Sequence, residues 1–202
     1  MRHGRFTRCL LLASLALLLA ACMSVPQRAT GAFVERSISL AGKAHRYQVF
    51  VPASAAGGRS PAVVVFLHGS GERGDDGDKP TRVGIGPYIR AHQDTFPAIA
   101  VFPQAAEDTE WSDNAGLVLA ALDAATREFH GDAERTYLTG LSMGGYGTWD
   151  IALRAPGRFA ALVPVCGGVK APGARTSLLV TAVAGEADPY AAIATRLRDV
   201  PA

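Results

Sequence analysis

Short apolar runs alternate along the chain with segments in which apolar residues recur every three or four positions. The clearest strand is the continuous run 61–67, which is apolar at every position, as in a strand buried on both faces of a parallel sheet. The clearest helix is 114–130, which Gly131 is expected to close. Further strands are predicted at 33–40, 45–51, 97–102, 135–139, 159–166 and 178–184, and further helices at 83–92, 146–154 and 190–197.

The order of these elements predicts an α/β domain. Strands 33–40 and 45–51 are separated by Ala41-Gly42-Lys43-Ala44, which reads as a hairpin turn, and the later strands alternate with helices. This pattern indicates a doubly wound, mostly parallel sheet with an antiparallel hairpin at its start. Right-handed crossovers would place the loops that follow the strands at one edge of the sheet, where ligands bind.

The first 32 residues are predicted to lie outside this domain. Three arginines in the first eight residues precede an apolar stretch, 10–20, that is too short for an ordinary membrane span. The stretch ends in Leu19-Ala20-Ala21-Cys22, which resembles the lipobox of bacterial lipoproteins. We therefore expect a signal peptide over 1–21, a lipid on Cys22, a tether over 22–32 and the domain over 33–202.

This reading places the protein in the cell envelope, held to a membrane by the lipid on Cys22. The next residue is Met23, which by resemblance favours the outer membrane of a Gram-negative cell. If Cys22 is not lipidated, the same segment is a plain secretory signal and the protein is secreted. Cys9 would be removed with the signal, so Cys166 alone remains, and it is expected to be a buried small hydrophobe without a disulfide partner.

Composition narrows the classes of partner. Of the 202 residues, 49% are hydrophobic and 19% are charged, as in a globular protein with a sizeable core. The net charge is +2 and no basic stripe is present, so nucleic acid is not an expected partner. The oligomeric state is not indicated by the sequence.

The motif that carries chemistry is Gly140-Leu141-Ser142-Met143-Gly144, a G-x-S-x-G sequence. It lies between a predicted strand and a predicted helix, which is the setting of a nucleophile elbow. Glycine is needed on both sides because a side chain there would collide in so tight a turn, and the serine takes a strained backbone angle. The pattern predicts that the Ser142 hydroxyl is exposed above the sheet as a nucleophile. The alternative is a glycine-rich helix N-terminus at which the serine has no chemical role.

A serine nucleophile also needs donors for the oxyanion and a base. The amide of Met143, directly after the nucleophile, is the first expected donor. The second is expected from the loop after strand 61–67, at the amide of Ser70 or, alternatively, of Gly71. His68 opens this loop, and we expect it to be a hydrogen-bonded loop histidine, not the base.

Two segments of the chain resemble the α/β-hydrolase superfamily. They are Phe66-Leu67-His68-Gly69-Ser70-Gly71-Glu72-Arg73-Gly74-Asp75-Asp76 and Tyr137-Leu138-Thr139-Gly140-Leu141-Ser142-Met143-Gly144-Gly145-Tyr146-Gly147-Thr148-Trp149. They are most similar to bacterial secreted esterases, a group that includes predicted peptidases, phospholipase/carboxylesterases and polyhydroxybutyrate-depolymerase-like proteins. The resemblance covers roughly 33–202. It implies a serine hydrolase that cleaves carboxylic esters through an acyl-enzyme on Ser142, without metal or organic cofactor.

The resemblance also implies a triad in the order Ser, Asp, His, and here the chain departs from the family. All five histidines precede Ser142, and the chain ends in Asp199-Val200-Pro201-Ala202, which is similar to the start of the phrase that bears the family's acid. We therefore expect a C-terminally incomplete domain in which the last strands are missing, with the acid and base beyond residue 202. Strand 159–166 would become a sheet edge, and activity would be impaired. Asp188 is the competing candidate for the acid.

Three further points stay open at the level of sequence. The carboxylates of Glu72, Asp75 and Asp76 are expected to belong to a solvated loop and not to a metal site. Trp111 and Tyr146 are candidates for lining the substrate pocket, with packing as the alternative for Tyr146. The substrate is expected to be a small ester, but a serine peptidase shares the same machinery, and a catalytically dead lipid-anchored binding protein is the rival of another class.

Overall fold

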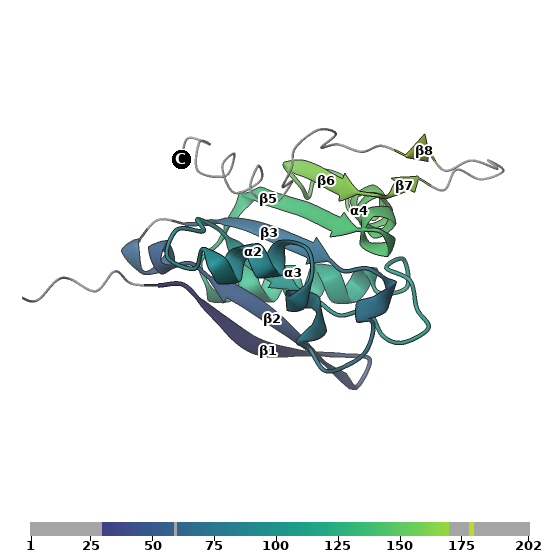
Figure 1. The fold of residues 1–202 in the computed structure, drawn as a ribbon, viewed down its shortest axis with the longest axis horizontal. Helices are drawn as coiled ribbons and strands as arrows, with labels where there is room; N and C mark the ends of the chain where they lie inside the picture. The colour runs from purple at the N-terminus through teal and green to yellow at the C-terminus, as the bar shows by residue number, and fades with distance from the viewer. Residues whose placement is uncertain (1–29, 59, 170–177, 180–202) are drawn as a thin grey trace, which may run out of the picture.

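The computed structural model describes residues 30–58, 60–169 and 178–179, which form a six-stranded sheet with helices on both faces (Figure 1). The strand order is β1-β2-β4-β3-β5-β6. The pairs β1–β2 and β2–β4 are antiparallel, whereas β4, β3, β5 and β6 run parallel to one another. The strands are β1 (Ala32–Leu40), β2 (Lys43–Val51), β3 (Ala62–Leu67), β4 (Ile99–Phe102), β5 (Asp132–Leu141) and β6 (Ala161–Val165). The predicted doubly wound, mostly parallel sheet with an N-terminal antiparallel hairpin is confirmed.

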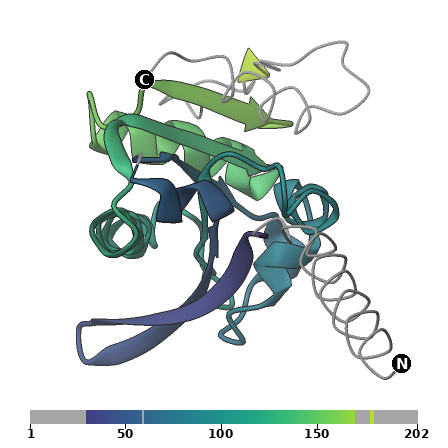
Figure 2. The same ribbon diagram turned by 90° about the vertical axis from the view of Figure 1, so that its left-hand side faces the viewer.

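The sheet divides the core into two layers, and helices cover both of its faces (Figure 2). Helices α3 and α4 pack on one face, and α2 packs on the other. β3 is buried at every position because its side chains alternate between these layers: Val63, Val65 and Leu67 face α3 and α4, and Val64 and Phe66 face α2. The helices are α2 (Ile85–Ala91), α3 (Ala115–Glu128) and α4 (Met143–Arg154), with 3₁₀ turns η1 (Ala53–Gly57), η2 (Ser70–Glu72) and η3 (Lys79–Arg82).

Two local predictions need correction in detail. The hairpin turn contains only Ala41 and Gly42, both at positive φ (48° and 78°), because a two-residue turn of this kind matches the twist of the paired strands. After α3, the residue at positive φ is His130 (55°), not Gly131. Gly131 is required for space instead, since a Cβ there would lie 2.5 Å from Val63 Cγ2.

The end of β6 differs more from expectation. Cys166 was expected to be buried because it follows an apolar run, but it is exposed, so that prediction is wrong. The physical reason is that β6 ends at Val165 and the backbone turns at Cys166, where φ is 52°. Among the described strands, β6 pairs with β5 alone, as expected for a strand at the edge of the sheet.

Beyond β6, the structure describes a short antiparallel pair, β7 (Gly168–Val169) with β8 (Leu178–Leu179). Only the first two residues of the predicted strand 178–184 are therefore described. The predicted helix 190–197, the signal peptide, Cys22 and Asp188 all lie outside the described residues. No helix among the described residues is long and apolar enough to cross a membrane.

Candidate active site

The turn between β5 and α4 holds Ser142 in a strained conformation, with φ 54° and ψ −113°. Few residues other than glycine adopt positive φ, and such strain persists only where the surrounding structure enforces it. Here the enforcement comes from close backbone approach. A Cβ on Gly140 would lie 2.2 Å from the Gly144 oxygen, and a Cβ on Gly144 would lie 1.9 Å from the Leu67 oxygen. The predicted need for glycine on both sides of the serine is confirmed.

The same turn leaves Ser142 exposed while fixing its backbone. The backbone amide of Ser142 donates to the Val165 carbonyl oxygen at the end of β6 (2.9 Å). The backbone carbonyl oxygen of Ser142 accepts the Tyr146 amide in the first turn of α4 (3.1 Å). The hydroxyl-bearing residue is therefore anchored on both sides. It stands at the carboxyl edge of the parallel strands, where ligand sites of α/β sheets form.

The loop after β3 lies directly beside this serine. A Cβ built on Gly69 would be 3.9 Å from the Ser142 Cβ and 3.7 Å from the Leu141 oxygen. Ser70 follows as the first residue of η2, and Met143 is the first residue of α4. Backbone amides at the first position of a helical segment have no carbonyl partner within that segment, so both can donate to a ligand. The assignment of these two amides as oxyanion donors stays a prediction.

His68 is buried at the end of β3, and both of its ring nitrogens are engaged. Nε2 accepts the Ala105 amide (3.0 Å), which requires Nε2 to be unprotonated, so Nδ1 carries the proton and donates to the Gly69 oxygen (2.6 Å). Desolvation by burial lowers the His68 pKa to about 4, with the nearby Arg73 charge acting in the same direction. A neutral imidazole with no free nitrogen cannot take a proton from Ser142, in agreement with the sequence-based expectation for His68.

Trp111 packs against His68 at the start of the loop after β3. Its Nε1 donates to the His68 oxygen (3.0 Å), and its ring meets the His68 ring edge to face, with centroids 4.8 Å apart. The indole is only 1% exposed. Trp111 therefore belongs to the packed core beneath the loop and does not line a substrate pocket as proposed from the sequence. Tyr146, the other candidate, is half-buried on α4.

The remainder of the loop after β3 is ordered, not merely solvated as expected. Asp76 accepts the amides of Asp78 (2.7 Å) and Lys79 (2.8 Å) and the side-chain amide of Gln104 (3.2 Å). Partial desolvation acts to raise the Asp76 pKa, but these hydrogen bonds outweigh it and hold the pKa well below its usual range. Arg73 donates to the Thr109 oxygen and to Glu110.

Gln104 is a structural residue that the sequence analysis did not single out. It is buried just after β4, accepts the Gly77 amide (2.7 Å) and donates to the Glu72 oxygen (2.9 Å). The only available signal in the sequence was its position, since a polar residue directly after a buried strand needs partners. Together Gln104 and His68 tie the loop after β3 to the loop after β4.

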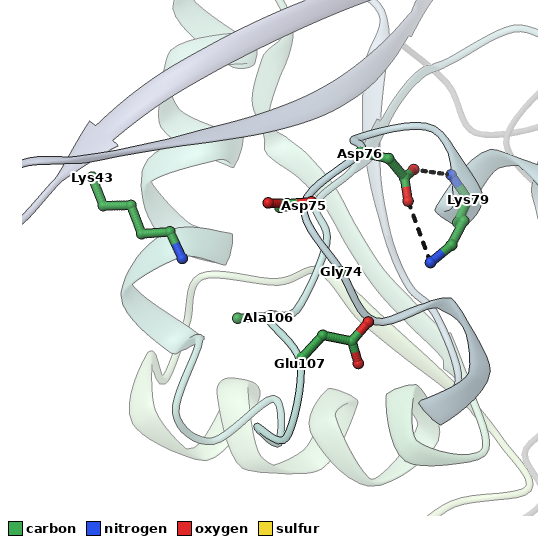
Figure 3. Close-up of a pocket in the computed structure, with 7 residues that line it drawn as sticks. All are labelled: Lys43, Gly74, Asp75, Asp76, Lys79, Ala106 and Glu107. Atoms are coloured by element: carbon green, nitrogen blue, oxygen red, sulfur yellow. Dashed lines mark hydrogen bonds and ion pairs between the residues drawn. The ribbon is translucent and has the colours of Figure 1, made fainter.

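A hollow of about 320 Å³ lies against the outer part of this loop and is lined by charged side chains (Figure 3). Lys43 reaches it from β2, Asp75 and Asp76 from the loop after β3, and Glu107 from the loop after β4. None of the predicted site residues lines it. Within the described residues, no group of three or more His, Cys, Asp or Glu side chains is placed to hold a metal ion.

The remaining described histidines lie on or beside other elements, away from the elbow. His45 is on β2, His92 caps α2, with Nδ1 2.8 Å from the Tyr88 oxygen, and His130 precedes β5 at the end opposite Ser142. The structure thus brings together Ser142, Met143 and the Ser70 loop, but places no free imidazole beside them among its described residues.

The comparisons with solved structures agree on the fold. A thermostable esterase shares 31% identity at a TM-score of 0.59, covering 67% of this chain and 41% of its own. The feruloyl esterase module from Clostridium thermocellum shares 14% identity (TM-score 0.59; 71% and 56% covered), and the S-formylglutathione hydrolase from Staphylococcus aureus shares 19% (TM-score 0.53; 69% and 60% covered). The chain has the α/β-hydrolase fold. The resemblance drawn from the loop and elbow motifs is confirmed at this level.

The chain spans about 41–60% of the length of these three structures. No protein-family model and no curated protein matches its sequence.

Proposed function

We propose that this α/β-hydrolase chain carries the nucleophile of a serine esterase that cleaves carboxylic esters through an acyl-enzyme. The observation that carries the proposal is the exposed Ser142, held at φ 54° by backbone contacts beside the loop that contains Ser70. Strain of this kind costs free energy and is concentrated at functional sites. The esterase at 31% identity supports the choice of ester substrates.

In the proposed reaction, the Ser142 hydroxyl oxygen attacks the ester carbonyl carbon and loses its proton to a base. The carbonyl oxygen becomes an oxyanion, which the amides of Ser70 and Met143 stabilise by donating hydrogen bonds. The alcohol then leaves with a proton, so that the acyl group remains on Ser142. Water attacks this acyl-enzyme, and the carboxylic acid is released with the serine restored.

Neither the base nor the acid of a triad is identified among the described residues. His68 is neutral with both ring nitrogens bonded, and Asp188 lies outside the described residues. Without a base, a serine hydrolase loses roughly 10⁴ to 10⁶ in turnover and retains the contribution of its oxyanion hole. We therefore propose that the described residues alone support only slow turnover.

Labelling with a fluorophosphonate probe tests the assignment of Ser142. We expect slow labelling that free imidazole accelerates, because imidazole would act as the missing base, and none in Ser142→Ala with or without imidazole. Ser37→Ala, which removes an exposed hydroxyl from β1, is the matched control and should label like the parent. Ester hydrolysis at the same rate in the parent and in Ser142→Ala would contradict the proposal.

The membrane anchor is a separate proposal that rests on the sequence alone. We propose that a lipid on Cys22 holds the protein at the cell envelope, since several acyl chains on one residue give stable anchoring. Expressed with its full N-terminus in a Gram-negative host, the protein should sediment with membranes, and Cys22→Ala should move it to the soluble fraction. Cys9→Ala is the control. Mass spectrometry showing an unmodified Cys22 in mature protein would disprove the anchor.

A further inference from the structure

A carboxylate lies beside the nucleophile on the loop after β3. A Cβ built on Gly69 would be 3.2 Å from Glu72 Oε2 and 3.9 Å from the Ser142 Cβ. The carboxylate oxygen and the nucleophilic side chain therefore flank the same point on the loop. Glu72 is half-buried, at the end of η2, two residues after the expected oxyanion donor Ser70.

The backbone of Glu72 is fixed on both sides. Its amide donates to the Gly69 oxygen (3.4 Å), and its carbonyl oxygen accepts from Gln104 Nε2 (2.9 Å). Gln104 is itself buried and bound to the Gly77 amide. These contacts hold the loop, and with it the start of the Glu72 side chain, in one position relative to Ser142.

The Glu72 carboxylate has no hydrogen bond or ion pair within the part of the chain that the structure describes. The two nearest cations in sequence are committed elsewhere. Arg73 pairs with Glu110 (2.7 Å) and the Thr109 oxygen (2.6 Å), and the Lys79 ammonium lies 3.5 Å from Asp76. A half-buried carboxylate without a partner is poorly compensated, so a cation supplied by a ligand would be stabilised there.

The inference rests on the proposed reaction, which the negative charge of Glu72 would affect. Attack by Ser142 creates a negative charge on the carbonyl oxygen, and a carboxylate nearby disfavours it. A positive charge on the substrate would offset both negative charges, whereas a negative charge on the substrate would add to the repulsion. We propose that Glu72 is a specificity-determining residue that makes the site prefer carboxylic esters bearing a cationic ammonium group close to the scissile carbonyl.

Three p-nitrophenyl esters of equal acyl chain length test the preference. Their acyl chains end in a trimethylammonium, a tert-butyl or a carboxylate group, and imidazole is present throughout. Ser142-dependent kcat/KM, corrected with Ser142→Ala, should be highest for the cationic ester. In Glu72→Gln, the ratio of cationic to neutral kcat/KM should fall about tenfold, and hydrolysis of the anionic ester should rise.

Two further variants separate charge from structure. Glu134→Gln removes an exposed carboxylate about 25 Å away along β5 and should keep the parent ratio. Glu72→Asp keeps the charge and should keep a cationic preference. High salt should reduce the preference in the parent and leave Glu72→Gln unchanged.

The outcomes distinguish the two proposals. If no ester shows hydrolysis that Ser142→Ala removes, the proposed function fails and this inference with it. If Ser142-dependent hydrolysis is present but Glu72→Gln changes the three esters by the same factor, or the cationic ester is not preferred by the parent, the inference is overturned while the proposed function stands.

Discussion

Gly144→Ala is expected to destabilise the native fold by at least about 3 kcal/mol and to remove fluorophosphonate labelling. The added Cβ would lie 1.9 Å from the Leu67 oxygen and 2.8 Å from the His68 oxygen. Both are backbone atoms, held by the pairing of β3 with its neighbours and by the bonds of the His68 loop, so neither can move aside cheaply. Since such proteins are stable by only about 5–15 kcal/mol, this is a large fraction of the total.

Gly116→Ala makes the same chemical change in another helix and serves as the matched control. Gly116 lies in α3, and a Cβ there would have no atom within 4 Å. Alanine favours a helix over glycine, so this variant should be about 0.5–1 kcal/mol more stable than the parent. Urea unfolding followed by circular dichroism measures both variants. A Gly144→Ala protein that is soluble, with a midpoint at or above that of the parent, would show that the elbow is not packed as described.

The elbow could be predicted from sequence because a G-x-S-x-G sequence between a strand and a helix is typical of this turn. The reason for Gly144 was not in the motif, since a Cβ there would meet the Leu67 oxygen of β3, whereas a Cβ on Gly140 would meet the Gly144 oxygen within the turn. The run 61–67 was equally informative, because a strand that is apolar at every position must be buried on both faces. Both patterns can be recognised within a few consecutive residues.

The partners of His68 and Trp111 could not be derived in the same way, because they are remote in sequence. His68 bonds Ala105, 37 residues later, and Trp111 reaches back 43 residues to the His68 oxygen. Cys166 shows the same limit, since an apolar run predicts a strand but not where the strand turns out of the sheet. These contacts follow from the order of β4, β3 and β5 in the sheet, which brings the loops after β3 and β4 together beside the elbow.

The stability of the protein is expected to fall by about 3 kcal/mol as the pH is lowered from about 6.5 to about 4, through His68 alone. Burial lowers the His68 pKa from 6.5 to about 4 in the folded state. Between these values the unfolded chain binds a proton at His68 that the folded chain does not, so acid favours unfolding. Below this range a second loss begins, because the Asp76 pKa is lowered in the folded state and its hydrogen bonds are lost on protonation.

His68→Gln tests this assignment, since glutamine can accept the Ala105 amide but does not titrate. The variant should be less stable than the parent at pH 7, because it fills the site less well and loses ring contact with Trp111. Between pH 6.5 and 4, its unfolding free energy should fall by about 3 kcal/mol less than that of the parent. Parallel pH profiles for the parent and His68→Gln would mean that His68 is not held neutral, and would reopen it as a candidate base for Ser142.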